Sequence, residues 1–181
     1  MEKIDPLTDL APEVEAALLK AGWRPDAKRN DNVGSTGSRS LAGKVLASLH
    51  DLKVQPPVST GTFRPLGVNF DPTIAYGYEA AIKNLGRCLN VELVPIGSVG
   101  GGLAILLMAE TGHLLLLGYA EPGLMLAGKS FSEGMKRILL GEPMPAIQPS
   151  IDPDGICSLE PAEAAGLSII YLGPKGLAGL N

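Results

Sequence analysis

The chain has 181 residues, of which 45% are hydrophobic and 19% charged, and this ordinary globular composition excludes a wholly disordered protein. Aromatic residues make up only 4%, so the core must be built mainly from aliphatic side chains, and few rings remain to stack on single-stranded nucleic acid. The net charge is −4, although seven Lys or Arg stand against three Asp between Lys20 and Lys53. That basic segment contains no dense run of cations, and we therefore do not expect nucleic acid as a partner.

Cysteine usage and hydropathy favour a cytoplasmic location. Cys88 and Cys157 are far apart and form no C-x-x-C pattern, which argues against a disulfide or a zinc site. The first ten residues, MEKIDPLTDL, carry acids and lack the apolar segment of a signal peptide. The longest uninterrupted apolar stretch, 103–109, is much shorter than the roughly 20 residues that a membrane span needs. No membrane partner is expected.

The first predicted helix begins at Pro12, where a missing backbone N–H costs nothing. Gly22 is expected to end the helix in the left-handed conformation. The same cap would place the Trp23 ring against Leu18, so we interpret this tryptophan as a packed structural ring. The apolar stripe of the helix is formed by Val14, Ala17, Leu18 and Ala21.

The next segments alternate between polar loops and periodic apolar stretches. The stretch Arg24–Ser40 is polar without a period and predicts an irregular loop. Helical spacing marks 41–52, whereas 66–70 alternates as a half-buried strand does. Asp71, which precedes a proline, predicts the start of a third helix that runs to Leu89.

Strands then dominate until a final helix. The hairpin turn Glu110-Thr111-Gly112 is predicted between two apolar runs, because Gly112 can take a positive φ. Ser130 and Glu133 form a capping box, which predicts a last helix that ends at Gly141. The predicted strands cover 92–97, 102–109, 113–119 and 124–128.

The composition changes beyond Gly141, where prolines follow one another closely. We expect residues 1–142 to form one domain and residues 143–181 to form a proline-rich C-terminal extension that can dock on it. The segment LSIIYLG, residues 167–173, is predicted to be a strand or a short helix, with no position assigned to it.

The triple glycine at Gly100, Gly101 and Gly102 admits two interpretations. A phosphate-binding loop needs glycines whose backbone N–H groups precede a helix. Here the apolar run Leu103–Met108 follows and leads into a turn, as a strand does, and the Lys-Ser/Thr of a P-loop is missing. We therefore predict a flexible connection between two antiparallel strands.

No catalytic or metal-binding constellation is recognisable in the sequence. His50 and His113 stand in no nucleophile or metal motif, and we interpret both as ordinary surface histidines. Asp152 and Asp154 lie in a DPDG that lacks the further ligands of a calcium loop, and a turn is the better interpretation. We therefore expect no catalytic residues, no metal and no cofactor.

The order of the motifs resembles the SUKH superfamily, specifically its third subfamily. The motifs are AGWRP at 21–25, ELVPIG at 92–97, GLAILLMAETGHLLLLG at 102–118 and SFSEGMKRILLG at 130–141, and the resemblance covers about residues 12–142. It implies an α+β fold with a curved, mainly antiparallel sheet flanked by helices. It also implies a non-enzymatic immunity protein of a bacterial polymorphic toxin system, which neutralises a cognate toxin domain by non-covalent occlusion.

Three hypotheses about function follow. In the first, the chain neutralises a toxin, and the acidic bulk of the chain would be attracted to the basic groove of a nuclease toxin. The polar loop Arg24–Ser40 is then the expected place of contact, since such segments commonly carry binding function. In the second, the chain is a non-enzymatic regulatory or scaffolding module that binds a cellular protein. In the third, it is a small enzyme whose site includes His50 or His113.

Overall fold

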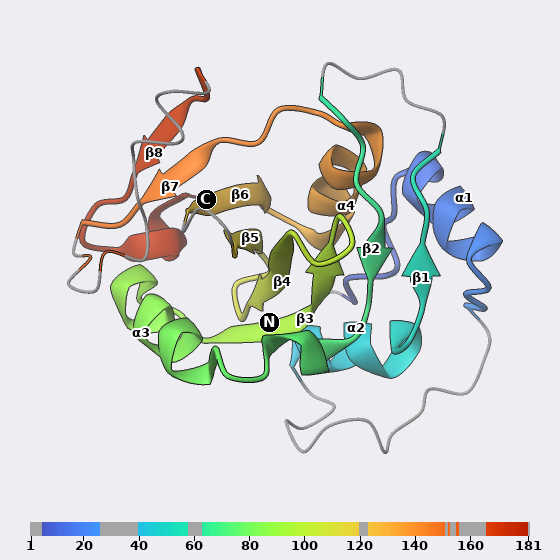
Figure 1. Ribbon diagram of the computed structural model, residues 1–181, viewed down its shortest axis with the longest axis horizontal. Coiled ribbons are helices and arrows are strands. Elements are labelled where there is room, and N and C mark those ends of the chain that lie inside the picture. Colours follow the sequence, from blue (N-terminus) through green and yellow to red (C-terminus); the bar gives the residue numbers. More distant parts are fainter. Residues whose placement is uncertain are drawn as a thin grey trace.

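The fold is α+β, with one curved and mostly antiparallel sheet flanked by helices, as predicted (Figure 1). The structure is a computed structural model, and it describes residues 5–25, 40–57, 63–119, 123–150, 152, 155 and 166–180. The strands are β1 (Lys53–Val54), β2 (Val68–Asn69), β3 (Leu93–Val99), β4 (Ala104–Ala109), β5 (Leu114–Gly118), β6 (Leu124–Gly128), β7 (Ala146–Gln148) and β8 (Ile169–Tyr171). The helices are α1 (Pro12–Lys20), α2 (Leu41–Leu49), α3 (Glu79–Leu89) and α4 (Phe131–Leu140), with the 3₁₀ helices η1 (Pro72–Ala75) and η2 (Gly176–Leu180).

The strands lie in the sheet in the order in which they occur in the sequence. All neighbours from β1 to β7 are antiparallel, whereas β7 and β8 are parallel. In the centre, Ile105 of β4 stands between Ser98 of β3 and Leu117 of β5. Every residue of β4 is buried, because helices cover both faces of the sheet at this point, and this explains the continuous apolar run.

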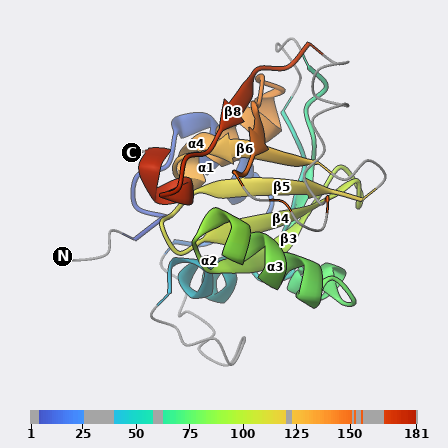
Figure 2. The same ribbon diagram turned by 90° about the vertical axis from the view of Figure 1, so that its left-hand side faces the viewer.

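Two separate hydrophobic cores lie on the two faces of the sheet. The α4-side core joins helices α1, α2 and α4 to side chains such as Leu106 and Met108 of β4. The α3-side core joins α3 to the alternate residues Ile105 and Leu107 of the same strand. Figure 2 looks onto α3, which lies in front of β3 and β4. Strand alternation thus divides one apolar run between two cores.

The N-terminal helix follows the prediction closely. Acidic residues occupy its first turn, and its apolar stripe is buried. Gly22 has φ 107°, and the N–H of Trp23 donates to the Leu18 carbonyl at 3.0 Å, as a C-terminal cap requires. Trp23 and Leu18 are both buried in the α4-side core. The interpretation of Trp23 as a structural ring is therefore confirmed.

The predicted helix from Asp71 to Leu89 is wrong in its first half. Only the short 3₁₀ helix η1 follows Asp71, and α3 begins at Glu79. Between them, Gly77 takes φ +88°, a conformation that no right-handed helix contains. The end of α3 is reached at Leu89, as predicted, with the left-handed Asn90 as its cap.

The observed ends of other helices and strands differ from the predicted ones by a few residues. The helix predicted to reach Leu52 stops at Leu49, and the left-handed Asp51 redirects the chain into β1, which was not predicted. The strand predicted over 66–70 is limited to β2. The turn at Gly112 and the end of the last helix at Gly141 are confirmed by positive φ angles of 94° and 69°.

The N-terminal cap of α4 is a variant of the predicted box. The Ser130 hydroxyl accepts a hydrogen bond from the Glu133 N–H at 3.2 Å, as expected. The Glu133 carboxylate accepts from the backbone N–H of Lys129, at 2.8 Å, one residue earlier than in a standard box.

The C-terminal segments extend the sheet beyond β6. β7, which was not predicted, pairs with β6 through Met125 and Ala146. Within LSIIYLG, the predicted alternative of a strand is confirmed as β8, which lies parallel to β7. Leu172 and Leu177 then enter the α3-side core. Gly176 is packed so tightly against the Leu89 carbonyl that a Cβ would overlap it, which fixes the end of the chain against α3.

Candidate functional site

The triple glycine is a connection between antiparallel strands, as predicted. It leads from β3 to β4 with φ angles of 62°, 72° and 97° at Gly100, Gly101 and Gly102. The N–H of Gly100 donates to the Gly67 carbonyl at 2.9 Å, and the N–H of Gly102 donates to Val99 at 3.1 Å. These donors hold the turn and do not surround an anion. The phosphate interpretation is therefore excluded by the geometry.

The two histidines occupy different environments. His50 is the C-terminal cap residue of α2, and its Nδ1 lies 2.9 Å from the Asp51 carboxylate at the surface. His113 was predicted at the surface, and this is wrong, because its exposed fraction is 1%. It directly precedes β5, whose inward residues belong to the cores, so the turn at Gly112 carries the ring inside.

The environment of His113 keeps its ring neutral. Its Nδ1 lies 2.8 Å from the Thr111 hydroxyl, and its buried Nε2 has no hydrogen-bond partner among the residues that the structure describes. Burial lowers the pKa of His113, the Lys129 cation lowers it further, and Glu133 opposes them. A neutral imidazole with one unused nitrogen is costly to bury, so this residue is a weak point of the fold.

No group of three or more His, Cys, Asp or Glu side chains that could hold a metal ion is found among the described residues. Asp154 and Cys157 lie outside the described residues, as does nearly all of the loop expected to bind a partner, residues 26–39. Within the described segments, none of the helices has the length and apolar character needed to cross a bilayer.

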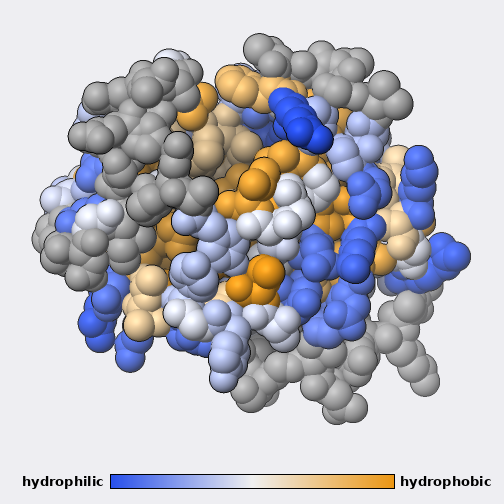
Figure 3. Space-filling view, viewed as in Figure 1, coloured by the Kyte–Doolittle hydropathy of each residue, from blue (hydrophilic) through white to orange (hydrophobic). Residues whose placement is uncertain are grey.

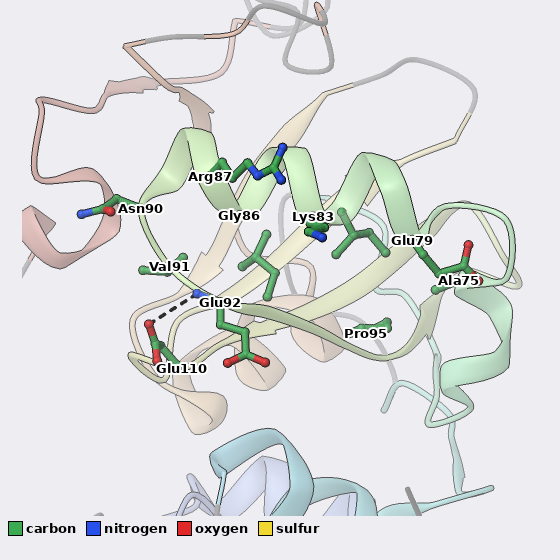
Figure 4. A pocket seen from close by; sticks show the side chains of 12 residues that line it. Ala75, Glu79, Lys83, Gly86, Arg87, Asn90, Val91, Glu92, Pro95 and Glu110 are labelled. Carbon is green, nitrogen blue, oxygen red and sulfur yellow. Dashed lines mark hydrogen bonds between the residues drawn. The ribbon is translucent and has the colours of Figure 1, made fainter. Parts of the chain in front are cut away.

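A groove of about 680 Å³ lies between α3 and β3 (Figure 4). Glu79, Lys83 and Arg87 follow one another at intervals of four residues, which places them on one side of α3. Glu92 and Glu110 stand on the opposite wall, where the Glu110 carboxylate accepts from the Glu92 N–H at 3.4 Å. The groove carries both signs of charge around an apolar floor formed by Ala75, Ile82, Val91, Leu93 and Pro95.

A second groove of about 600 Å³ lies along β1 and β2 and reaches the triple glycine. Among the described residues, its charged lining side chains are Lys53 and Arg64, and none is a carboxylate. Ile74 of η1 and Leu103 are among its apolar lining residues. The two grooves therefore differ in charge, the first being mixed and the second basic.

The turn between η1 and α3 contributes lining residues to both grooves, and hydrogen bonds hold its two ends. The Asp71 carboxylate accepts from the N–H of Thr73 at 3.0 Å and from its hydroxyl at 2.6 Å. The hydrogen bond from the Thr73 hydroxyl lowers the pKa of Asp71 most, followed by that from the N–H. At the other end, the Glu79 carboxylate accepts from the Gly77 N–H at 2.9 Å. The carboxylates of Asp71 and Glu79 thus both accept hydrogen bonds from backbone N–H groups of this turn.

Tyrosines complete the support of the turn. The Tyr119 hydroxyl donates to the Ile74 carbonyl at 2.9 Å, and its ring meets Tyr78 edge to face with 5.0 Å between centroids. Burial raises the pKa of Tyr119, which keeps this hydroxyl protonated as a donor. Tyr76, which lies between Ile74 and Tyr78 in the sequence, is 88% exposed. The sequence signal was YGY at 76–78, which holds two of the four tyrosines of the chain.

Comparison with known protein families agrees with this architecture. A sequence model described as "SUKH-3 immunity protein" matches residues 10–141, which is well over half of the chain. The chain belongs to the SUKH-3 immunity protein family. The resemblance to the third SUKH subfamily is therefore confirmed. No curated protein and no solved structure matches this SUKH-3 family member.

The family match places the two grooves inside the shared part of this SUKH-3 chain. It includes α1 to α4 and β1 to β6, and therefore both grooves and the turn between them. It stops before β7, β8 and η2. The residues of β7 and β8 that complete the sheet come from outside the matched segment.

Proposed function

We propose that this SUKH-3 family member is an immunity protein that binds the toxin domain of a bacterial polymorphic toxin system and neutralises it by non-covalent occlusion. The family match over residues 10–141 carries this proposal. In the proposed mechanism the chain forms and breaks no covalent bond. It covers the active site of the toxin or closes its substrate groove, inside the cytoplasm of the cell that it protects.

The proposed mode of action needs a rigid surface and does not need a reactive group. Specific protein interfaces bury roughly 1,200–2,000 Å² in total, and a few desolvated side chains dominate their energy. The sheet between two cores supplies such a rigid support, and a hydrogen-bonded turn contributes lining residues to both grooves. Little conformational freedom would be lost there on binding.

We also propose that residues 1–142 are the toxin-binding domain and that residues 143–181 are an extension docked on it. The end of the family match at residue 141 supports the boundary. The pairing of β7 with β6 and the packing of Leu177 beside α3 support the docking.

Co-expression tests the proposed function. The chain is expressed in bacteria together with the toxin domain encoded beside its gene, and growth is scored with and without the chain. We expect rescued growth and one complex on gel filtration. Absence of both would refute the immunity function, and a stable complex with a host protein in place of the toxin would favour a regulatory or scaffolding module.

A further inference from the structure

The groove between α3 and β3 has two walls of opposite charge. Among the described residues, its charged lining side chains are Glu79, Lys83, Arg87, Glu92 and Glu110, and all five are exposed. In Figure 4, Lys83 and Arg87 lie along α3, and we call this side the cationic wall. Glu92 and Glu110 lie across the groove, and we call that side the acidic wall. Glu79 stands in the first turn of α3, where its carboxylate accepts a backbone hydrogen bond from the preceding turn.

The two walls do not neutralise each other. Among the described residues, no ion pair joins Lys83 or Arg87 to the carboxylates of the acidic wall. Arg87 donates instead to the Asn84 side chain on its own helix, at 3.3 Å. The Glu110 carboxylate accepts a long hydrogen bond, 3.4 Å, from the Glu92 N–H on the same wall. Each wall therefore keeps its charge for an occupant of the groove.

The floor between the walls is apolar and partly open to water. Val91, Leu93 and Pro95 line it, and all three are half-buried. Val91 and Leu93 are also packed against the α3-side core, which holds them in place. Covering the rest of their apolar surface would remove it from water, and this favours association.

The backbone fixes the distance between the walls. The Val91 N–H donates to the Gly86 carbonyl at 3.0 Å. A Cβ at Gly86 would lie 2.8 Å from the Val91 carbonyl oxygen, so the end of α3 packs closely on the chain that leads into β3. On the acidic wall, the Glu110 N–H donates to the Glu92 carbonyl at 3.0 Å. A groove held in this way is preformed, and binding has little backbone left to order.

We propose that this groove is where the chain binds its toxin, and that its occupant is a short extended segment of the toxin with charges of both signs. An acidic side chain of the segment faces the cationic wall, and a basic side chain faces the acidic wall. An apolar side chain of the segment covers the floor. This inference rests on the proposed immunity function and assigns the contact to a surface other than the polar loop after α1.

The length and the charges of the groove support an occupant of this kind. From Glu79 to Arg87, α3 rises by about 12 Å, which is the length of about four residues of extended chain. Successive side chains of an extended chain point to opposite sides, so neighbouring residues of the segment reach the two walls. A segment turned over about its axis would bring like charges together, and the walls therefore select one orientation.

Other exposed features carry less information about a partner. Figure 3 shows hydrophobic residues in several places on the face seen in Figure 1, so exposed apolar residues by themselves do not mark one site. The groove along β1 and β2 has cations but no carboxylate among its described lining residues. It therefore lacks a second wall of opposite charge that would fix the orientation of a segment.

Charge reversal on each wall is the decisive test, because it separates contact in the groove from attraction at long range. Lys83→Glu makes the net charge of the chain more negative, and Glu92→Lys makes it less negative. Long-range attraction to a charged toxin would change in opposite directions in these two variants, whereas contact with an occupant of both signs is weakened by both. The measurement is the dissociation constant for the toxin domain encoded beside the gene, by calorimetry with a catalytically inactivated toxin. We expect each variant to bind about tenfold more weakly.

Helix α1 supplies matched controls on the other face of the sheet. Lys20→Glu and Glu15→Lys make the same changes of charge at exposed positions of a helix that packs in the α4-side core. We expect both controls to bind within about twofold of the wild type. Val91→Trp fills the floor without changing any charge and is expected to bind about tenfold more weakly. Unfolding temperatures equal to that of the wild type show that the fold of each charge variant is intact.

The outcomes distinguish the two proposals. If the wild-type chain binds the toxin, and Lys83→Glu and Glu92→Lys bind equally tightly or change in opposite directions, the groove is refuted and the immunity function stands. If the chain alone forms a dimer on gel filtration that Lys83→Glu dissociates, the occupant is a second copy of the chain and the toxin segment is refuted. If the wild-type chain neither binds nor protects, the immunity function is refuted and the groove with it. A loss of binding in both groove variants, with unchanged controls, supports both proposals.

Discussion

The two faces of the sheet are built from different parts of the chain. The α4-side core is closed by three helices, and all three lie within the segment that the family match covers. The α3-side core takes one α-helix, α3, from that segment, together with Ala75 of η1, and includes Leu172 and Leu177 from the C-terminal residues. The same strands therefore support two cores of different origin. The matched segment supplies all the helices of the α4-side core, whereas the α3-side core also needs residues from the C-terminal segment.

The largest expected effect breaks the α4-side core. Phe131 is fully buried and its ring lies 6.1 Å from that of Phe70, between centroids. Phe131→Ala should lower the free energy of unfolding by about 3–5 kcal/mol, because it removes apolar contact and leaves a cavity. Urea denaturation measures this. Phe63→Ala, at an exposed ring, is the control, and an equal loss there would contradict the assignment of the core.

The next effect tests whether the C-terminal segment belongs to the α3-side core. Leu177→Ala should lower the free energy of unfolding by about 2–4 kcal/mol, since the side chain is fully buried against the α3 face. The half-buried Leu180 gives a control from the same 3₁₀ helix, with a smaller loss expected. Urea curves that coincide for wild type and Leu177→Ala would mean that this core is closed without the tail.

A smaller effect on stability is expected from the N-terminal cap of α4. Ser130→Ala removes the acceptor for the Glu133 N–H and should cost about 1 kcal/mol. Thermal unfolding detects a change of this size, and Ser130→Asp should restore most of the stability because it can accept the same hydrogen bond. A loss that Asp fails to restore would argue that the hydroxyl acts in another way.

The smallest effect is a pH dependence of stability that arises at His113. Burial lowers the pKa of His113 below its unfolded value of 6.5, so the unfolded chain binds the proton more readily. Stability from this residue is therefore complete above about pH 6.5 and declines as the pH falls below it. His113→Leu should flatten the dependence of the free energy of unfolding on pH between about pH 7.5 and 5.5, measured by urea denaturation. Equal slopes for wild type and His113→Leu would overturn this account.

Local sequence signals predicted the parts of the fold whose cause is local. The cap at Gly22, the turn at Gly112 and the continuous run of β4 each depend on a few adjacent residues. β1 and β7 were missed because two or three residues carry no period, and only pairing with a neighbouring strand makes them strands. His113 was misplaced for a similar reason, since its burial is decided by what packs over the turn.

The candidate site was less predictable than the fold. The sequence predicts partner contact at the polar loop after α1, because irregular polar segments often carry binding function. The exposed Tyr76 lies in a segment that the sequence predicts as one continuous helix, whereas the structure divides it into η1 and α3. The break at Gly77, where φ is +88°, separates η1 from α3, and no period in the sequence predicts it.

The unequal lengths of the strands bear on the resistance of the protein to aggregation. Both end strands are short, with two residues in β1 and three in β8, and β1 begins with a lysine. The long leucine-rich strands β4 and β5 are paired on both sides and covered on both faces. An exposed strand of that composition would be a template for fibrils. The backbone of the most fibril-prone segments is therefore paired within the sheet and is not available for pairing with a second molecule. This arrangement favours a folded chain that stays in solution at high concentration.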